Sequence, residues 1–335
     1  MANIRVNKRP ETERATDNLL VAGDYYPRHT SAEPLISRDI QKLVTQSDGA
    51  IVNLEAPIHT ETPPINKYGP ALSLARDSID KVSEMGFTGA TLANNHIMDY
   101  GGAGLRETTT RLEANDVGWV GAGENRREAF TPMTVTTANH DVSIINAADR
   151  EFGTVSESEP GYAWLGDDLS GELRDQTKES DITVLVLHGG IEYEPIPAAQ
   201  RRERYQRLAE TGVDVILGHH PHVPKGWEVH EGTPICYSLG HFLFDFDRKS
   251  RKPKTEWGLL ADVRIESGSV KEVVLVPVQQ HQDHPRVRLL GDNKPQEQYL
   301  SVCQNVLNSR SKFHGLWQEL AVTRYEEYYG KRLRG

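Results

Sequence analysis

Cysteine is scarce in this chain, since only Cys236 and Cys303 occur among 335 residues and they form no CxxC pair. Their scarcity excludes a disulfide framework and a thiolate zinc site. A run of about 18 apolar residues is also missing, which excludes a transmembrane helix. Residues 1–18 lack the apolar segment of a signal peptide or anchor. We therefore predict a cytoplasmic protein with reduced thiols.

Positive charge is in short supply as well, with 38 Lys+Arg against 48 Asp+Glu and a net charge of −10 at pH 7. Nucleic acid is excluded as a partner, because binding phosphates by charge needs a net basic face. Histidine, by contrast, is plentiful, with 13 residues. Because histidine is the commonest metal ligand and the usual acid or base near neutral pH, it matters whether these residues are scattered or gathered at one site.

Short β-branched runs alternate with amphipathic helical patterns along most of the chain. Runs of this kind suit strands buried on both faces, and the alternation predicts a layered α/β domain. The predicted strands are 19–22, 50–54, 87–93, 142–147, 182–187, 213–217, 235–239, 259–265 and 270–278. Loops separate the last three, which favours antiparallel pairing there.

The sequence shows no internal repeat and no low-complexity linker, so one large domain is favoured over two. We predict a flexible N-terminal tail over residues 1–17 and the domain over residues 18–280. Residues 281–335 are predicted to be a C-terminal helical extension packed on that domain.

Six predicted strands end in polar residues of metal-ligand type. These residues are Asp24, Asn53 with Glu55, Asn94 to His96, His188, His219 to His222, and His241. Each one alone fits a turn or a helix cap. Together they favour one shared site, because open α/β sheets place ligands at the carboxyl ends of their strands. The strongest element is His220-Pro221-His222, where proline fixes the chain between two imidazoles.

The residue types also indicate the cofactor. Carboxylate and amide oxygens with neutral imidazoles and no thiolate suit Mn, Fe or Zn ions. The candidates outnumber the protein ligands of one catalytic ion, whereas two ions about 3.5–4 Å apart would use them all. We therefore expect one or two divalent ions, which activate water for attack on a phosphorus or carbonyl centre.

The motifs NLEAPI, LANNHIMDYG, LHGG with its following EY, GVDVILGHHPH and YSLGHFLFD resemble the CapA/PgsA family. That family is associated with poly-γ-glutamate capsule biosynthesis and is a branch of the calcineurin-like metallophosphoesterases. The resemblance covers residues 18–280 and implies an αββα sandwich of two mixed β-sheets flanked by helices. The metal ligands that it implies are Asp24, Glu55, Asn95, His188, His220 and His222.

Other site residues follow from the same motifs. The resemblance implies that His96 is the general acid and that Asp99 and Asn53 lie near the site, and we group Asp99 and His241 with His96 as catalytic residues. The predicted substrate contacts are Asn53, Tyr26, Arg248 and Lys249. The last two belong to a basic run, which is either a solvated loop or a border of the site that attracts an anionic substrate.

Three positions depart from the family pattern. Tyr26 stands where related phosphoesterases have the histidine of Asp-x-His, which predicts that one ion is under-ligated or absent. Gly189 replaces a tryptophan, which we expect to widen the pocket. His241 replaces the asparagine of SLGN, and it is an added ligand, a substrate contact or neutral drift.

Three functions fit these features. The leading hypothesis is a metal-dependent hydrolase that cleaves a phosphoester or amide in an anionic small molecule, peptide or polymer. A second is a peptide epimerase that removes and returns a Cα proton. A third is a non-catalytic accessory subunit in a poly-γ-glutamate synthesis complex, whose partner would be a biosynthetic enzyme.

Overall fold

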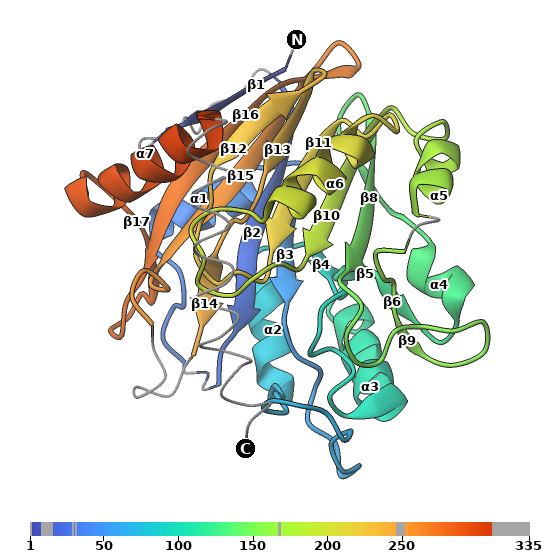
Figure 1. Ribbon diagram of the computed structural model, residues 1–335. Coiled ribbons are helices and arrows are strands. Elements are labelled where there is room, and N and C mark those ends of the chain that lie inside the picture. The colour runs from blue at the N-terminus through green and yellow to red at the C-terminus, as the bar shows by residue number, and fades with distance from the viewer. Residues whose placement is uncertain are drawn as a thin grey trace, which may run out of the picture.

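The computed structural model describes residues 2–7, 16–28, 30, 32–166, 169–245 and 252–309. Within these residues, two large sheets face each other and helices cover their outer faces (Figure 1). The predicted αββα sandwich of two mixed sheets is therefore confirmed.

The first sheet contains nine strands and is parallel through its centre, from β2 to β5. In spatial order its main path is β1 (Asn3–Val6), β16 (Ser269–Gln280), β15 (Trp257–Glu266), β2 (Asp17–Tyr26), β3 (Gly49–Leu54), β4 (Gly89–Thr91) and β5 (Gly118–Val120). Two further strands join this path, namely β14 (His241–Phe244) beside β2 and β17 (Val287–Leu289) beside β16.

The second sheet contains six strands, of which β8, β10, β11 and β13 are parallel. Its order is β12 (Trp227–His230), β13 (Thr233–Cys236), β11 (Val215–His219), β10 (Ile182–His188), β8 (Asp141–Ala148) and β7 (Met133–Thr136). A small separate ribbon pairs β6 (Ala122–Gly123) with β9 (Gly161–Tyr162).

Among the residues that the structure describes, the helices lie between strands in the chain order, except the last helix, which follows the final strand. They are α1 (Arg38–Thr45), α2 (Arg76–Glu84), α3 (Gly101–Glu113), α4 (Arg126–Phe130), α5 (Leu169–Gln176), α6 (Ala199–Ala209) and α7 (Lys294–Asn308). In the described part of the chain, none of them has the length and apolar character needed to cross a membrane.

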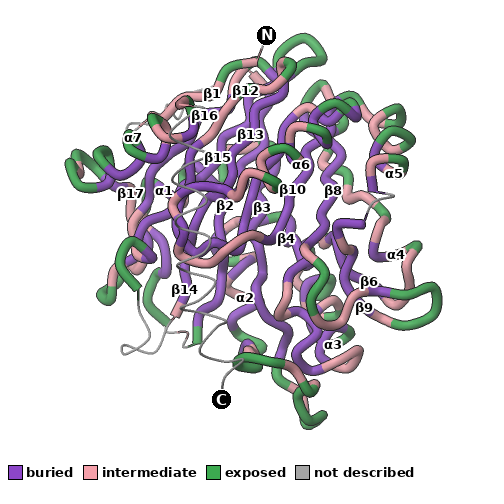
Figure 2. Tube along the Cα trace, in the orientation of Figure 1, coloured by how far each residue is buried: buried purple, intermediate pink, exposed green. Residues whose placement is uncertain are grey.

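Three apolar clusters separate the layers. Leu19 of β2 belongs to the cluster between the sheets, whereas the next residue, Leu20, belongs to the cluster under α1 to α3. In the second sheet, Val184 faces the first sheet and Leu185 faces Tyr205 of α6. Strands buried on both faces read as continuous apolar runs, which is why the sequence predicted them well. Figure 2 shows the buried strands at the centre of the molecule.

The two ends of the predicted domain differ from expectation. Residues 3–6, predicted to be part of a flexible tail, form β1 and pair with β16, because Ile4 and Val6 pack against the cluster between the sheets. Residues 281–309 are not wholly helical, since β17 precedes α7. The antiparallel pairing of β15 with β16 is confirmed, whereas β13 lies parallel to β11 in the other sheet.

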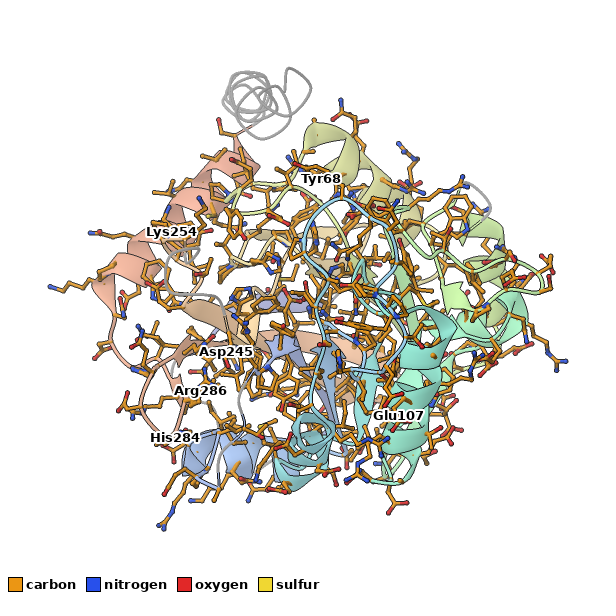
Figure 3. The ribbon with its side chains drawn as sticks, turned by 90° about the horizontal axis from the view of Figure 1, so that it is seen from below. Tyr68, Glu107, Asp245, Lys254, His284 and Arg286 are labelled. Atoms are coloured by element: carbon orange, nitrogen blue, oxygen red, sulfur yellow. The ribbon has the colours of Figure 1, made fainter. Side chains whose placement is uncertain are left out.

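The chain crosses from the second sheet to the first between β13 and β14. The sequence pattern predicts His241 at the end of the strand 235–239, but the structure places it at the start of β14, opposite Asp24 in the register with β2. The far end of β14 is fixed by Asp245, which accepts a hydrogen bond from Nη1 of Arg286 at 3.0 Å. Figure 3 shows these two residues close together on the lower face.

Candidate metal centre

Two buried carboxylates form the base of the site, Asp24 in β2 and Glu55 directly after β3. Nδ2 of Asn53 donates to Oδ1 of Asp24 at 2.8 Å and to Oε2 of Glu55 at 3.2 Å, so Asn53 holds the two side by side. Among the described residues, Oδ2 of Asp24 and Oε1 of Glu55 are buried without a hydrogen-bond partner. Because buried polar atoms are normally paired, these two oxygens are candidate ligands for a cation.

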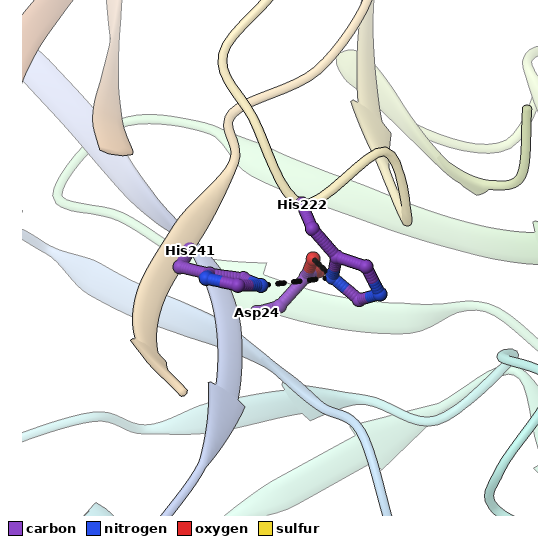
Figure 4. A group of neighbouring side chains, drawn as sticks. All are labelled: Asp24, His222 and His241. Carbon is purple, nitrogen blue, oxygen red and sulfur yellow. Dashed lines mark hydrogen bonds and ion pairs between the residues drawn. The ribbon is translucent and has the colours of Figure 1, made fainter. Parts of the chain in front are cut away.

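Asp24, His222 and His241 form one group whose ligand atoms all lie within 4.8 Å of one another (Figure 4). Nδ1 of His222 is 3.4 Å from Oδ2 of Asp24 and 2.8 Å from Nε2 of His241. All three side chains are buried.

Glu55, His188 and His220 form a second group of the same size. Nε2 of His188 lies 3.7 Å from Oε1 of Glu55, 3.2 Å from Nδ1 of His220 and 3.1 Å from Oδ1 of Asn95. The groups are neighbours, because Nε2 of His222 in the first lies 3.8 Å from Oε1 of Glu55 in the second. The structure thus brings together all six residues predicted to be metal ligands. Their oxygen and imidazole atoms fit Mn, Fe or Zn.

Burial and neighbouring charges shift the pKa values of the candidate ligands in different directions. Burial lowers the pKa of His188 well below its usual range and that of His220 to about 4, so both imidazoles are neutral at neutral pH. Neutral imidazole is the form that binds a metal. Burial also raises the pKa of Glu55, and the charge of Asp24 raises it further. For Asp24, burial acts in the same direction but is outweighed by the neighbouring imidazoles of His219 and His222, which leave its pKa well below the usual range.

The HHPH segment has strained backbone. His220 and His222 adopt positive φ angles of 89° and 61°, a region that residues with side chains seldom occupy. Neighbouring backbone holds the segment, since Gly189 N–H donates to His219 O at 3.0 Å and Tyr193 N–H donates to Pro221 O at 2.8 Å. Such strain is typical of functional sites.

His96 and Asp99 also meet at this edge. Nδ1 of His96 is 2.7 Å from Oδ2 of Asp99, which also accepts from Leu72 N–H at 2.7 Å. Burial lowers the pKa of His96 below its usual value. Sequence reasoning missed Lys67, whose ammonium pairs with Asp99, donates to Asn95 O at 3.1 Å and lies 3.0 Å from Nδ1 of His96. Lys67 belongs to no motif, so only the fold could reveal it.

Sequence reasoning also missed the role of His219, although this residue stands within the GHHPH motif. It is fully buried, and its Nδ1 lies 3.1 Å from Oδ1 of Asp24. Together with Asn53, it fixes the orientation of the carboxylate. Asn53 is a predicted substrate contact. In the structure its amide nitrogen donates to Asp24 and Glu55.

Other predicted features lie elsewhere. Tyr26 is buried with its ring 5.0 Å from that of Phe244, and its role as a substrate contact stays a prediction. The expected wider pocket at Gly189 is wrong, because Oδ2 of Asp149 lies 2.3 Å from where a Cβ would stand and fills that space. Arg248 and Lys249 lie outside the described residues.

The fold and the site define an αββα sandwich with two neighbouring candidate metal-ligand groups where the strands end. Residues 17–246 match the family described as bacterial capsule synthesis protein PGA_cap, and the chain belongs to that family. The predicted resemblance to CapA/PgsA is thereby confirmed.

Individual relatives agree with this assignment. The chain is 28% identical over 273 residues to the capsule biosynthesis protein CapA of Bacillus anthracis, covering 77% of this chain and 65% of the relative. It is 31% identical over 179 residues to the PGA biosynthesis protein CapA of Bacillus subtilis, covering 52% and 47% respectively. A probable polyglutamine synthesis accessory protein of Mycobacterium tuberculosis is 26% identical over 217 residues, covering 61% and 57%. The chain therefore spans about half to two thirds of the length of these relatives.

Proposed function

We propose that this chain is a metal-dependent hydrolase that cleaves a phosphoester or amide bond in an anionic substrate of capsule or poly-γ-glutamate-type biosynthesis. The observation that carries the proposal is the pair of adjoining groups around Asp24 and Glu55, each with a buried carboxylate oxygen that has no hydrogen-bond partner among the described residues. Protein sites with two neighbouring divalent ions commonly serve hydrolysis.

Two sets of residues would bind the two ions. Asp24 and His222 would bind the first, and Glu55, His188 and His220, with Asn95, would bind the second. Bound ions of this kind supply Lewis-acid polarisation and an activated water. Asn53 and His219 keep Asp24 oriented throughout, because both contact its Oδ1 atom.

His96 is the residue best placed to move a proton. Asp99 engages Nδ1, which leaves Nε2 as the nitrogen that can exchange a proton with the substrate. In its doubly protonated form, with Nδ1–H held by Asp99, His96 would pass the Nε2 proton to the departing oxygen or nitrogen. Asp99 and Lys67 would position the ring, because both lie within hydrogen-bond distance of Nδ1 of His96.

The substrate class rests on the relatives. Their names refer to capsule, PGA and polyglutamine synthesis, which supports an anionic peptide or polymer as substrate. The basic run with Arg248 and Lys249 would attract such a polyanion.

A direct experiment compares metal-free protein with protein loaded with Mn or Zn, using poly-γ-glutamate, γ-glutamyl peptides and simple phosphomonoesters and diesters as substrates. We expect turnover of at least one class with metal and none without it. His188→Ala should abolish that turnover, whereas His230→Ala, which alters a partly exposed pair with Glu210, should not. Absence of metal-dependent turnover across the panel would contradict a hydrolase.

A second candidate is an accessory subunit of a polymer-synthesis complex, which the name of the mycobacterial relative favours. It predicts that the chain captures a ligase partner and that polymer synthesis survives the double change of His220 and His222 to alanine. Loss of synthesis in that variant, with the complex intact, would favour the enzyme. None of these three relatives is described as an epimerase, so epimerisation is not carried further.

A further inference from the structure

The first ion has too few ligands in the predicted set. Asp24 and His222 are available, but the histidine of Asp-x-His is replaced by Tyr26, whose ring packs against Phe244 in the core. Catalytic ions are commonly held by three protein ligands. We propose that His241 is the third ligand of the first ion. Strand β14 would then supply the ligand that the Asp-x-His motif lacks in this chain.

Hydrogen bonding sets the tautomer of His241 for this role. Its Nδ1 lies 2.8 Å from the carbonyl oxygen of Thr255. A carbonyl can only accept, so Nδ1 carries the proton and Nε2 presents its lone pair. Metal-binding histidines commonly donate their other ring N–H to a carbonyl in this way. Thr255 is itself fixed in a turn, because its hydroxyl donates to Lys252 O at 2.7 Å.

The lone pair faces the other two ligands. Nε2 of His241 is 2.8 Å from Nδ1 of His222, which is 3.4 Å from Oδ2 of Asp24. Two nitrogens that each lie about 2.0–2.1 Å from one ion stand within about 4 Å of each other, and these two atoms meet that limit. A hydrogen bond between the imidazoles would explain the short distance between them. It would leave Oδ2 of Asp24 without a hydrogen bond, whereas a shared ion satisfies all three atoms.

The backbone is built to bring His241 this close. A Cβ on Gly23 would stand 2.1 Å from Gly240 O, and one on Gly258 would stand 1.8 Å from His241 O. Only glycine lets β14 lie in this position, with His241 opposite Asp24. The side chain is 2% exposed, which argues against a substrate contact, and the fitted surroundings argue against neutral drift.

The consequence is a centre with two matched halves. Each ion would receive two imidazoles and one carboxylate, and the second would also be near Asn95. Such nitrogen-rich sets favour Zn, Fe or Mn over Mg or Ca. This inference rests on the metal centre of the proposed function but not on the reaction performed there.

The first test counts metal. Wild-type protein and His241→Asn, which restores the amide of the family motif, are loaded with Zn, freed of excess and analysed for bound metal. We expect two equivalents in the wild type and one in the variant, or a loss of affinity at one site of at least about tenfold. The control is His230→Asn, which should keep both equivalents. Two equivalents with unchanged affinity in His241→Asn would overturn the proposal.

The second test uses the unmodified chain, so that it holds even if the variant fails to fold. With ¹⁵N-labelled histidine, NMR should show His241 protonated at Nδ1 in metal-free protein, and Zn should shift the resonance of its Nε2. An unchanged Nε2 resonance at saturating Zn would overturn the proposal. Metal-dependent turnover with unchanged metal content in His241→Asn would contradict this inference and spare the proposed function. If no hydrolysis is found but His241→Asn loses metal as predicted, the proposed function is contradicted and this inference stands.

Discussion

At the scale of single residues, the centre combines two adjacent carboxylates whose pKa values move apart. The pKa of Asp24 is low and that of Glu55 is high, because the imidazoles of His219 and His222 adjoin Asp24 while Glu55 is buried beside a negative charge. The two titrate as a coupled pair. A divalent ion would relieve the repulsion between them, which is the physical reason to expect metal here.

His188 is the proposed ligand whose removal should affect metal binding most directly. It contacts Asn95 and His220 and lies near Glu55, so His188→Ala removes one ligand and leaves the Glu55 group incomplete. We predict that at least one equivalent of metal is lost while the circular dichroism spectrum is retained. Unchanged metal content in this variant would refute the ligand assignment.

Lys225 gives a pH-dependent prediction away from the ligands. Burial lowers its pKa from the ordinary 10.5 to about 7, with Arg201 adding to the effect and Glu194 opposing it. Between these pH values Lys225 is protonated in the unfolded chain and neutral in the folded chain. The amount by which the buried lysine destabilises the fold therefore decreases as the pH rises from about 7 toward 10.5.

Lys225→Met should therefore stabilise the protein at pH 7, by an amount on the order of a few kcal/mol, and by less near pH 10. Urea unfolding of both proteins at pH 7 and pH 9.5 measures the difference. An equal gain at the two pH values would show that the lysine charge is not responsible.

At the scale of elements, the strand ends explain how much of the site the sequence could reveal. Apolar runs that finish in Asp24, Glu55 or His188 marked the central strands and their polar ends, and all six predicted ligands do converge. The place of β14 could not be read, because its pairing with β2 depends on the crossing between sheets after Cys236. Lys67 was invisible for a similar reason, since its partners come from a distant turn.

Gly23→Ala tests the close passage of β14. The added Cβ would stand 2.1 Å from Gly240 O, a backbone atom that cannot turn aside. We predict a loss of about 1–3 kcal/mol or more in the free energy of unfolding, together with weaker metal binding. The matched control is Gly171→Ala, because an added Cβ there meets nothing within 4 Å.

In α5 that control should be neutral or stabilising by up to about 1 kcal/mol, because alanine is the better helix former. Denaturant unfolding distinguishes the two variants. Equal stability of Gly23→Ala and wild type would contradict the claim that the crossing requires glycine.

At the scale of the whole molecule, the two sheets are held together by the apolar cluster between them, which contains none of the proposed metal ligands. A change in that cluster should therefore alter the free energy of unfolding without altering the metal content. Leu217, fully buried in that cluster, should cost about 2–5 kcal/mol on change to alanine. Val302→Ala, at a side chain that is 60% exposed, should change stability by less than about 0.5 kcal/mol. Metal content per folded chain should be unaltered in both. Loss of metal from folded Leu217→Ala would contradict this separation.

The architecture was more predictable than the ends of the chain. Alternating strands and helices indicated a layered α/β domain, because parallel strands need crossover helices and are buried on both faces, and the family resemblance implied the sandwich. Strand β1 escaped prediction because Asn3 to Val6 is too short and too polar to stand out from the residues around it. The sequence predicted α7 as a helix. It did not predict strand β17, which precedes α7 and pairs with β16.

The most direct measurement of the central claim is the metal content of the folded wild-type chain after loading with Mn, Fe or Zn and removal of excess. The account predicts two equivalents per chain, one held at Asp24 and one at Glu55. A folded chain that binds no divalent metal under these conditions would contradict it.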